Sequence, residues 1–191
     1  MLHSFTFRKT AQGRKMLVTS LLVMLMAAWF APVCARSAEE RADERQYKIE
    51  SAILYNFFNY ITWPGYDAPE DLLKPNLCVY GNDPILKYLD YVRQKMAYER
   101  ALNIRRLTES AELKGCQMVY IRDATPVQAA KLLAAEGVLT VSNRPDFIEE
   151  GGMIELIESG GRIVFEINST ELSKAGFQAS SRLLALARKV E

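Results

Sequence analysis

Apolar residues dominate the chain from Tyr47 to Trp63, and their spacing is that of a helix. One apolar stripe repeats at intervals of three and four residues and consists of Ile49, Ile53, Phe57 and Tyr60 or Ile61. Further apolar side chains stand beside this stripe, namely Leu54, Tyr55 and Phe58. A helix that is apolar on more than one side normally packs on more than one side. The second contact can lie within the domain or at a subunit interface, and the pattern allows both.

Shorter apolar runs follow the helix and alternate with helical patterns. They predict strands at residues 77–80, 102–107, 118–121 and 138–142, with helices at about 84–91 and 125–135. A hairpin at 153–158 and 162–168, a short helix capped by Asn168 and interrupted at Gly176, and a last helix at 180–189 complete the chain. Alternating strands and helices predict an α/β fold: a mixed, mostly parallel sheet flanked by helices, with a C-terminal antiparallel hairpin.

The N-terminal segment, residues 1–35, has the pattern of a secretory signal peptide. A basic start containing Arg8 and Lys15 precedes an apolar stretch at 16–30, and the small-residue site Val33-Cys34-Ala35 follows. The alternative is an uncleaved anchor, but a span needs about 20 apolar residues. We therefore predict a signal peptide at 1–35 and one exported domain at 36–191.

Removal of this segment changes the charge and the available chemistry. Four of the 24 Lys and Arg residues lie in it, which leaves 20 against 23 acidic residues and a formal charge of −3. This balance does not favour binding to nucleic acid. The only histidine, His3, leaves as well, so catalytic triads and metal sites that use histidine are excluded from the domain. We expect no catalytic residues, no metal and no cofactor, although carboxylate pairs cannot be recognised without the fold.

Two cysteines remain in the exported domain, Cys78 and Cys116. An even pair in an oxidising compartment favours a disulfide. A bridge closing a loop of this length would stabilise the fold by roughly 4 kcal/mol on the chain-entropy model. The alternative is two buried thiols that act as small apolar side chains.

A candidate contact surface combines the first helix with a glycine-rich loop. Paired glycines before a strand permit unusual backbone geometry, and the loop could present a side chain to a partner or simply form a bulge. The acidic residues of 149–158 are expected to form a solvated edge. The residues assigned to the surface are Tyr55, Phe58, Trp63, Phe147, Gly151 and Gly152.

Several segments in order resemble the YfiR family. They are residues 47–57 (YKIESAILYNF), 62–64 (TWP), 77–84 (LCVYGNDP), 115–116 (GC), 139–142 (LTVS), Phe147 with 151–154 (GGMI), 165–168 (FEIN) and 180–187 (SSRLLALA). The resemblance covers essentially all of the exported domain. Its specificity lies in the succession of segments after a signal peptide, because no single segment is diagnostic.

The resemblance implies a periplasmic negative regulator. Such a protein binds the periplasmic sensor domain of an inner-membrane diguanylate cyclase and lowers cyclic-di-GMP, which controls biofilm formation and motility. An outer-membrane lipoprotein relieves the repression by sequestering the regulator. Family members form homodimers and carry a structural disulfide that Cys78 and Cys116 match, whereas the second cysteine pair of some members is missing here. The alternative function is a small-ligand-binding module that signals to a membrane sensor kinase or transporter.

Overall fold

The computed structural model describes residues 40–96, 101–108, 113–122 and 137–191. By its internal contacts the chain divides after Glu44, and the part from Arg45 to Glu191 contains the sheet and its core. Of the preceding part, only residues 40–44 are described, and they belong to a helix whose described residues are 40–60. The predicted signal peptide and the helix expected at 125–135 lie outside the described residues.

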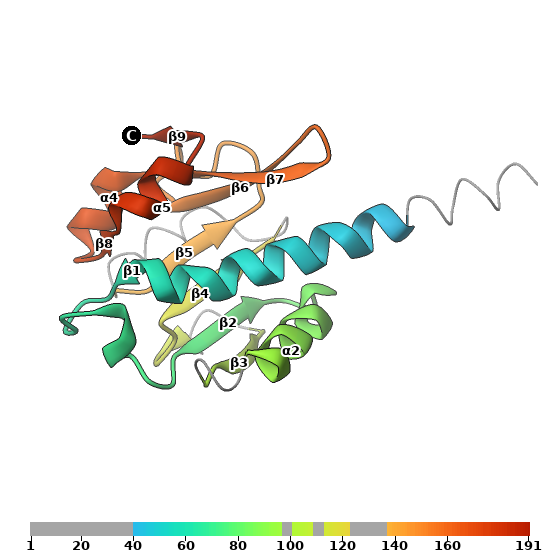
Figure 1. Cartoon of the computed structure of the whole chain (residues 1–191), viewed down its shortest axis with the longest axis horizontal. Coiled ribbons are helices and arrows are strands. Elements are labelled where there is room, and N and C mark those ends of the chain that lie inside the picture. Colours follow the sequence, from blue (N-terminus) through green and yellow to red (C-terminus); the bar gives the residue numbers. More distant parts are fainter. Residues whose placement is uncertain (1–39, 97–100, 109–112, 123–136) are drawn as a thin grey trace, which may run out of the picture. The chain divides into compact units, whose positions relative to one another are not determined.

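A seven-stranded mixed sheet organises this unit, with the order β3-β2-β4-β5-β6-β7-β9 (Figure 1). The strands from β3 to β6 are parallel, β7 is antiparallel to β6, and β9 is parallel to β7. The predicted fold class and the antiparallel hairpin are therefore confirmed. The strands are β2 (Asn76–Tyr80), β3 (Asn103–Leu107), β4 (Met118–Ile121), β5 (Leu139–Ser142), β6 (Ile154–Ser159), β7 (Arg162–Ile167) and β9 (Lys189–Val190).

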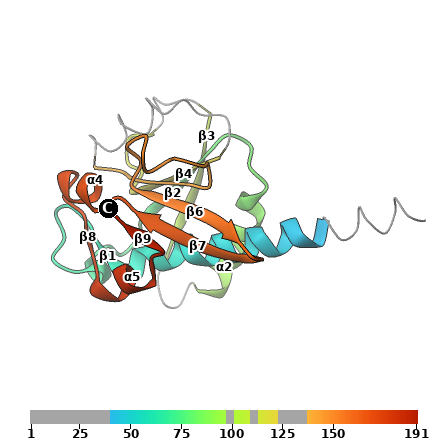
Figure 2. The ribbon, with the colours of Figure 1, turned by 90° about the horizontal axis from the view of Figure 1, so that it is seen from above.

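The central strands β2, β4 and β5 are buried on both faces, which is usual for strands of a parallel sheet. The alternation of side chains sends Leu77 and Val79 to one apolar cluster and Cys78 to another. The larger cluster includes Leu54 and Phe57 of the N-terminal helix. Figure 2 shows that this helix, α2 (Ile85–Lys95) and α5 (Ser181–Leu186) lie on one side of the sheet.

Short helices and their caps follow the local sequence signals. Asp83 precedes Pro84, and its Oδ1 accepts a hydrogen bond of 2.8 Å from the backbone N–H of Ile85 at the start of α2. Asn168 caps α4 (Ser169–Lys174) by accepting from the backbone N–H of Glu171, as expected. A single 3₁₀ turn, η1 (Pro69–Asp71), precedes β2.

The sequence did not predict two short strand pairings, that of β9 with β7 and a second, separate pair. The strand β1 (Ile61–Thr62) follows the N-terminal helix directly and pairs antiparallel with β8 (Gln178–Ala179).

The last helix ends at Leu186 rather than at Lys189, so that prediction was wrong at its C-terminus. The backbone N–H of Arg188 donates to Phe165 O at 2.8 Å, and this sheet bond replaces another helical turn.

Cys78 and Cys116 form the predicted disulfide, with their Cα atoms 5.9 Å apart. Cys78 lies within β2, and Cys116 lies in the turn that leads into the neighbouring strand β4. The bridge belongs to the smaller apolar cluster, together with Val119 and Phe147. It therefore joins two adjacent strands from within the core.

Candidate functional site

The three aromatic residues assigned to a surface on the first helix lie in the core. Tyr55 is 1% exposed, Phe58 0% and Trp63 2%. Trp63 stacks on Phe58 at 4.9 Å between ring centroids and meets the edge of Phe177 at 5.3 Å. The expectation of an exposed aromatic surface is therefore corrected. The second packing contact of this helix lies inside the domain, because the segment around Phe177 folds back over it.

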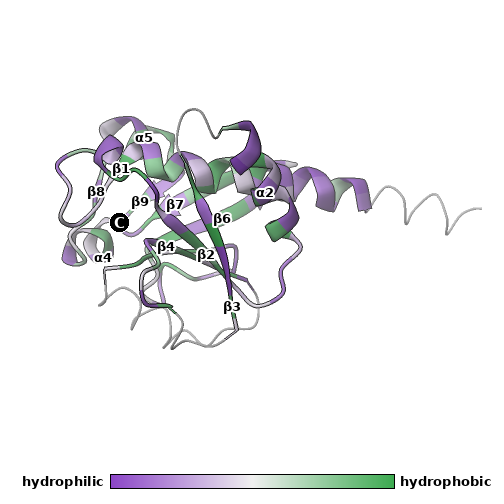
Figure 3. Cartoon of the chain, turned by 90° about the horizontal axis from the view of Figure 1, so that it is seen from below, coloured by the Kyte–Doolittle hydropathy of each residue, from purple (hydrophilic) through white to green (hydrophobic). Residues whose placement is uncertain are grey.

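From Ser51 onward, the accessible residues of the N-terminal helix are uncharged. Ala52, Asn56 and Asn59 are exposed there, and Ile53 and Tyr60 are half-buried. No charged residue occurs from Ser51 to Tyr66. Figure 3 shows the hydrophilic colour of the helix start giving way to apolar colour in its later turns. An uncharged face of this kind is typical of the centre of a contact surface.

An apolar pocket of about 280 Å³ opens on this uncharged face. The N-terminal helix, β7 and α5 supply its walls. Leu186 of α5 lines the pocket and is 65% exposed. The pocket is lined by Ile53, Asn56, Phe57, Tyr60, Phe165, Leu183 and Leu186.

The glycine-rich loop is folded tightly against the sheet. Phe147 is 2% exposed, and a Cβ atom at Gly152 would lie 2.2 Å from its ring. The backbone N–H groups of Phe147 and Ile148 donate to Glu155 Oε2 at 2.8 and 3.4 Å. Phe147 is therefore a core residue rather than an exposed contact, and this part of the predicted surface is also corrected. Gly152 is buried and Gly151 half-buried.

The outer rim of the same loop is exposed and polar. Pro145, Asp146 and Glu149 face solvent, and Arg144 forms an ion pair of 3.1 Å with Glu150. Asp146 has a positive φ of 62° and turns the chain, a conformation that aspartate tolerates better than most residues. Inner hydrogen bonds hold this rim in one shape, including one of 3.1 Å from Asn168 Nδ2 to Ile148 O.

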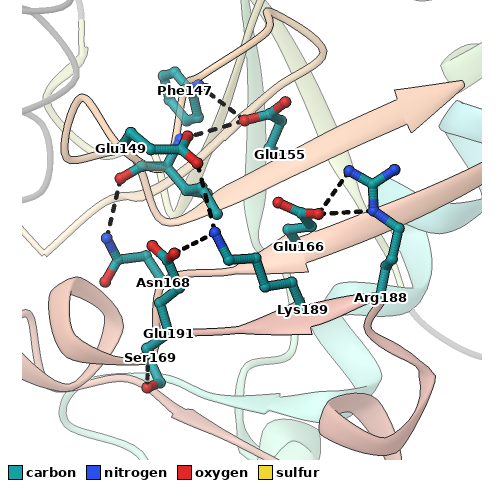
Figure 4. Close-up of polar contacts among 10 residues, drawn as sticks. Phe147, Glu149, Glu155, Glu166, Asn168, Ser169, Arg188, Lys189 and Glu191 are labelled. Carbon is teal, nitrogen blue, oxygen red and sulfur yellow. Dashed lines mark hydrogen bonds and ion pairs between the residues drawn. The ribbon is translucent and has the colours of Figure 1, made fainter.

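The C-terminal strand lies beside this rim (Figure 4). Lys189 reaches Glu149 at 3.6 Å and also contacts Glu191. Arg188 donates to the largely buried Glu166 at 2.7 Å. Ion pairs thus join the loop, β7 and the end of the chain into one polar surface. We call it the loop–C-terminus surface and define it by the accessible residues Arg144–Asp146, Glu149, Glu150 and Arg188–Glu191.

A separate polar cluster is buried between the N-terminal helix and the carboxyl ends of β2 and β4. Glu50 is 0% exposed and accepts from Tyr120 Oη at 3.0 Å and from Gln46 Nε2 at 2.9 Å. Arg122 Nη1 lies 3.8 Å from Glu50 and 3.6 Å from Asp83. Burial raises the pKa of Glu50, against the opposing hydrogen bond of Gln46 and the charge of Arg122.

Several of these residues carry no clear signal in the sequence. Glu155 is 6% exposed, so the expectation that it belongs to a solvated acidic edge was wrong. Its side chain turns inward because two backbone donors of the loop need an acceptor there. Glu50 offered a detectable signal, since it is a single acid at the start of an otherwise apolar helical stretch. Leu186 offered none.

Within the described residues, no group of three or more His, Cys, Asp or Glu side chains is arranged to hold a metal ion. Among the described helices, none is both long and apolar enough to cross a membrane.

Two solved structures of distantly related sequence are similar to this chain. The chain is similar to the ABC domain in complex with L-Trp from Streptococcus pneumoniae, with a TM-score of 0.50 and 7% identity over 72% of this chain and 58% of that one. It is also similar to a conserved domain protein from Vibrio cholerae O1 biovar eltor, with a TM-score of 0.45 and 12% identity over 61% of this chain and 54% of that one. The chain spans little more than half the length of either. At such identities the first likeness concerns the fold alone.

The family comparison covers far more of the sequence. The model of the YfiR/HmsC-like family matches residues 47–188, from the N-terminal helix to the residue before β9. That range contains the disulfide, the apolar pocket and the glycine-rich loop. The chain therefore belongs to the YfiR/HmsC-like family, whose members are periplasmic and regulatory rather than catalytic and act in cyclic-di-GMP signalling.

Proposed function

We propose that this protein represses an inner-membrane diguanylate cyclase by binding the cyclase's periplasmic sensor domain. The observation that carries the proposal is the family match, which extends over residues 47–188. The predicted signal peptide at 1–35 would place the domain in the periplasm, where such a sensor domain is accessible. The result of binding would be less cyclic-di-GMP and less biofilm.

We assign the cyclase contact to the loop–C-terminus surface. Its exposed residues Asp146 and Glu149 stand on a loop that buried hydrogen bonds hold in place. A contact surface that is already ordered loses little conformational entropy on binding. Charged residues of both signs at its edge, such as Glu149 and Lys189, favour orientation of a partner over unspecific adhesion.

The test compares two charge reversals in the same protein. Glu149→Arg changes the proposed surface, whereas Glu158→Arg changes an exposed residue near the tip of the β6–β7 hairpin. Both variants and the unaltered protein are used to capture purified periplasmic domains of the diguanylate cyclases from the same organism. We expect Glu149→Arg to lose at least tenfold in affinity and Glu158→Arg to bind normally.

The same comparison is made in cells by measuring cyclic-di-GMP. Deletion of the gene should raise the level of cyclic-di-GMP. Only the unaltered protein and Glu158→Arg, each supplied to the deletion strain, should return cyclic-di-GMP to its original lower level. An unchanged level after deletion, with the cyclases expressed, would contradict repression. Equal capture of the cyclase domains by both variants would instead show that the cyclase does not bind at the loop.

Release of the cyclase is proposed to involve an outer-membrane lipoprotein that sequesters the regulator. Overproduction of such a lipoprotein should then raise cyclic-di-GMP only in cells that contain this protein. A rise in the deletion strain as well would contradict sequestration.

The small-ligand alternative would place a ligand in the apolar pocket. Pockets for drug-sized ligands usually have volumes of about 300–1,000 Å³ and are mostly apolar, with a small number of polar groups for orientation. This pocket, of about 280 Å³, lies at the lower limit of that range, and Asn56 and Tyr60 supply polar side-chain groups to its lining. We prefer the repressor because of the family match over residues 47–188. A ligand-induced rise in melting temperature, with no binding to any cyclase domain, would reverse this preference.

A further inference from the structure

We propose that the exposed side of α2 and β3 binds the anionic surface of a phospholipid membrane, which holds the protein at the membrane without insertion into it. We call this side the basic face and define it by Lys87, Tyr91, Lys95 and Arg106. The proposal concerns lipid alone. It goes beyond the repression proposed above and does not depend on a cyclase partner.

Charge is distributed unevenly across the sheet. Together α2 and β3 carry five basic residues and one acid, Asp90. The described residues from 137 to 191, which include the opposite edge of the sheet, carry six basic and eight acidic residues. Asp90 is paired within α2, because Arg93 donates to it at 2.9 and 3.1 Å. A domain of negative formal charge therefore has an excess of four positive charges at one edge.

The basic side chains of α2 are exposed and point the same way. Lys87, Tyr91 and Lys95 recur every four residues and therefore lie along one stripe of the helix. All three are exposed, Tyr91 to 54%. Lys95 Nζ lies 5.1 Å from the centre of the Tyr91 ring. Among the described residues, no carboxylate forms an ion pair with Lys87, Lys95 or Arg106, so their charges are available to an external anionic surface.

The strand β3 extends the basic face to the edge of the sheet. It is the outermost of the seven strands and lies beside α2 (Figure 1). Arg106 is exposed and donates to the neutral amide oxygen of Asn82 at 3.3 Å. Arg105, half-buried on the other side of the strand, adds a further positive charge at this edge. The basic face ends at the turn before β2, where acidic side chains begin again with Asp67, Glu70 and Asp71.

A lipid surface fits this face better than a single acidic peptide. Lys87 and Lys95 are about 12 Å apart along the helix, and Arg106 belongs to a different element. A continuous anionic surface reaches all three, whereas an extended peptide at the edge of β3 would follow that strand alone. Tyrosine beside lysine is also typical of membrane interfaces, where the ring and the lysine stem lie at the level of the headgroups. Each basic side chain near an anionic bilayer favours binding roughly fivefold.

The basic face and the loop–C-terminus surface lie at opposite edges of the sheet. Six interstrand spacings separate β3 from β9, which is roughly 30 Å at about 4.8 Å per spacing. Lipid bound at one edge therefore leaves the other edge accessible. Weak binding to the membrane would raise the local concentration of the protein around any partner that is anchored there.

The test measures sedimentation of the protein, purified from the periplasm, with vesicles. One set contains phosphatidylglycerol and phosphatidylcholine in equal amounts, and the other contains phosphatidylcholine alone. We expect binding to the first set only, and release in about 0.5 M NaCl, because salt screens exposed charges.

Two double charge reversals locate the contact. Lys87→Glu combined with Lys95→Glu should lower the partition coefficient at least tenfold. The matched control is Arg162→Glu combined with Arg182→Glu, which changes the net charge equally at two exposed positions outside the basic face. The control should bind within threefold of the unaltered protein.

Circular dichroism shows whether each variant is folded. Because negative charge in the last turn of a helix is unfavourable, Lys87→Gln combined with Lys95→Gln is measured as well and should bind at least fivefold more weakly. No sedimentation of the unaltered protein with the phosphatidylglycerol vesicles would overturn the proposal. So would equal losses in the basic-face variants and the control, since net charge alone would then explain binding. Equal binding to soluble poly-L-glutamate would also overturn it, by assigning the basic face to an acidic protein.

Discussion

The ring of Phe147 occupies the space that a side chain at residue 152 would need. A Cβ atom added to Gly152 would lie 2.2 Å from two carbons of that ring. The same two residues are joined by a backbone hydrogen bond of 2.8 Å, from Gly152 N to Phe147 O. The loop thus closes on itself, and glycine is required because of the ring and not because of its backbone angles.

Gly152→Ala should therefore destabilise the protein. Overpacking of a filled core site typically costs about 1–3 kcal/mol, and this value is the expected loss in the free energy of unfolding by denaturant. The matched variant is Gly152→Ala combined with Phe147→Ala, in which the added methyl group has space. If the added methyl group costs as much in the Phe147→Ala background, the assignment of the clash to the ring is wrong.

Replacement of both Cys78 and Cys116 by serine should lower stability without abolishing the fold. The bridge closes a loop with a sequence separation of 38 residues, and the chain-entropy model assigns it roughly 4 kcal/mol. The measurement is the urea midpoint of the variant against that of the unaltered protein, each without reductant. Addition of reductant should lower the midpoint of the unaltered protein and leave the variant unaffected. Two free thiols in the denatured, non-reduced protein would disprove the bridge.

Glu50 should make stability depend on pH in the weakly acidic range. Its folded pKa lies above the ordinary value of 4.5, so the folded state holds this proton more tightly than the unfolded chain. Stability associated with Glu50 is then fully present below pH 4.5 and is lost as pH rises through the folded pKa. Denaturant titrations of the unaltered protein and of Glu50→Gln, compared pH by pH, should differ in slope across this window.

Glu155 titrates in the same direction, because burial raises its pKa too, and it remains in both proteins. Only the difference between the two curves therefore reports on Glu50. Parallel curves for the unaltered protein and Glu50→Gln would show that the pKa of Glu50 is not raised by folding.

Arg188→Ala should release the C-terminal strand. Arg188 donates to Glu166 at 2.7 Å, and the Glu166 side chain is only 9% exposed. Loss of a hydrogen bond to a charged group costs about 1.5–3 kcal/mol, and the partial exposure of Arg188 places the expected effect at the low end. Amide hydrogen exchange should accelerate at Glu191, whose N–H bonds Ile167 O. Lys189→Ala is the control, since Lys189 is 45% exposed and its loss should matter little.

Local patterns were sufficient to predict the longer strands of the sheet. The stretch from Leu77 to Tyr80 and the hairpin around Gly160 have the alternation and turn residues of strands, so these elements were confirmed. The two-residue strands β1, β8 and β9 have no such pattern. They form because segments that are distant in the sequence pair with each other, β1 with β8 and β9 with β7, and no local pattern indicates such pairing.

The candidate site shows the same division more sharply. The sequence determined that the N-terminal helix is apolar on more than one side, that Cys78 and Cys116 could pair, and that the chain resembles one family. Only the tertiary structure decided which apolar residues are exposed. Trp63, Phe58 and Phe147 are covered, whereas Leu186 is left at the rim of a pocket. Hydrophobicity is a property of a residue, but its exposure depends on which distant segment packs over it.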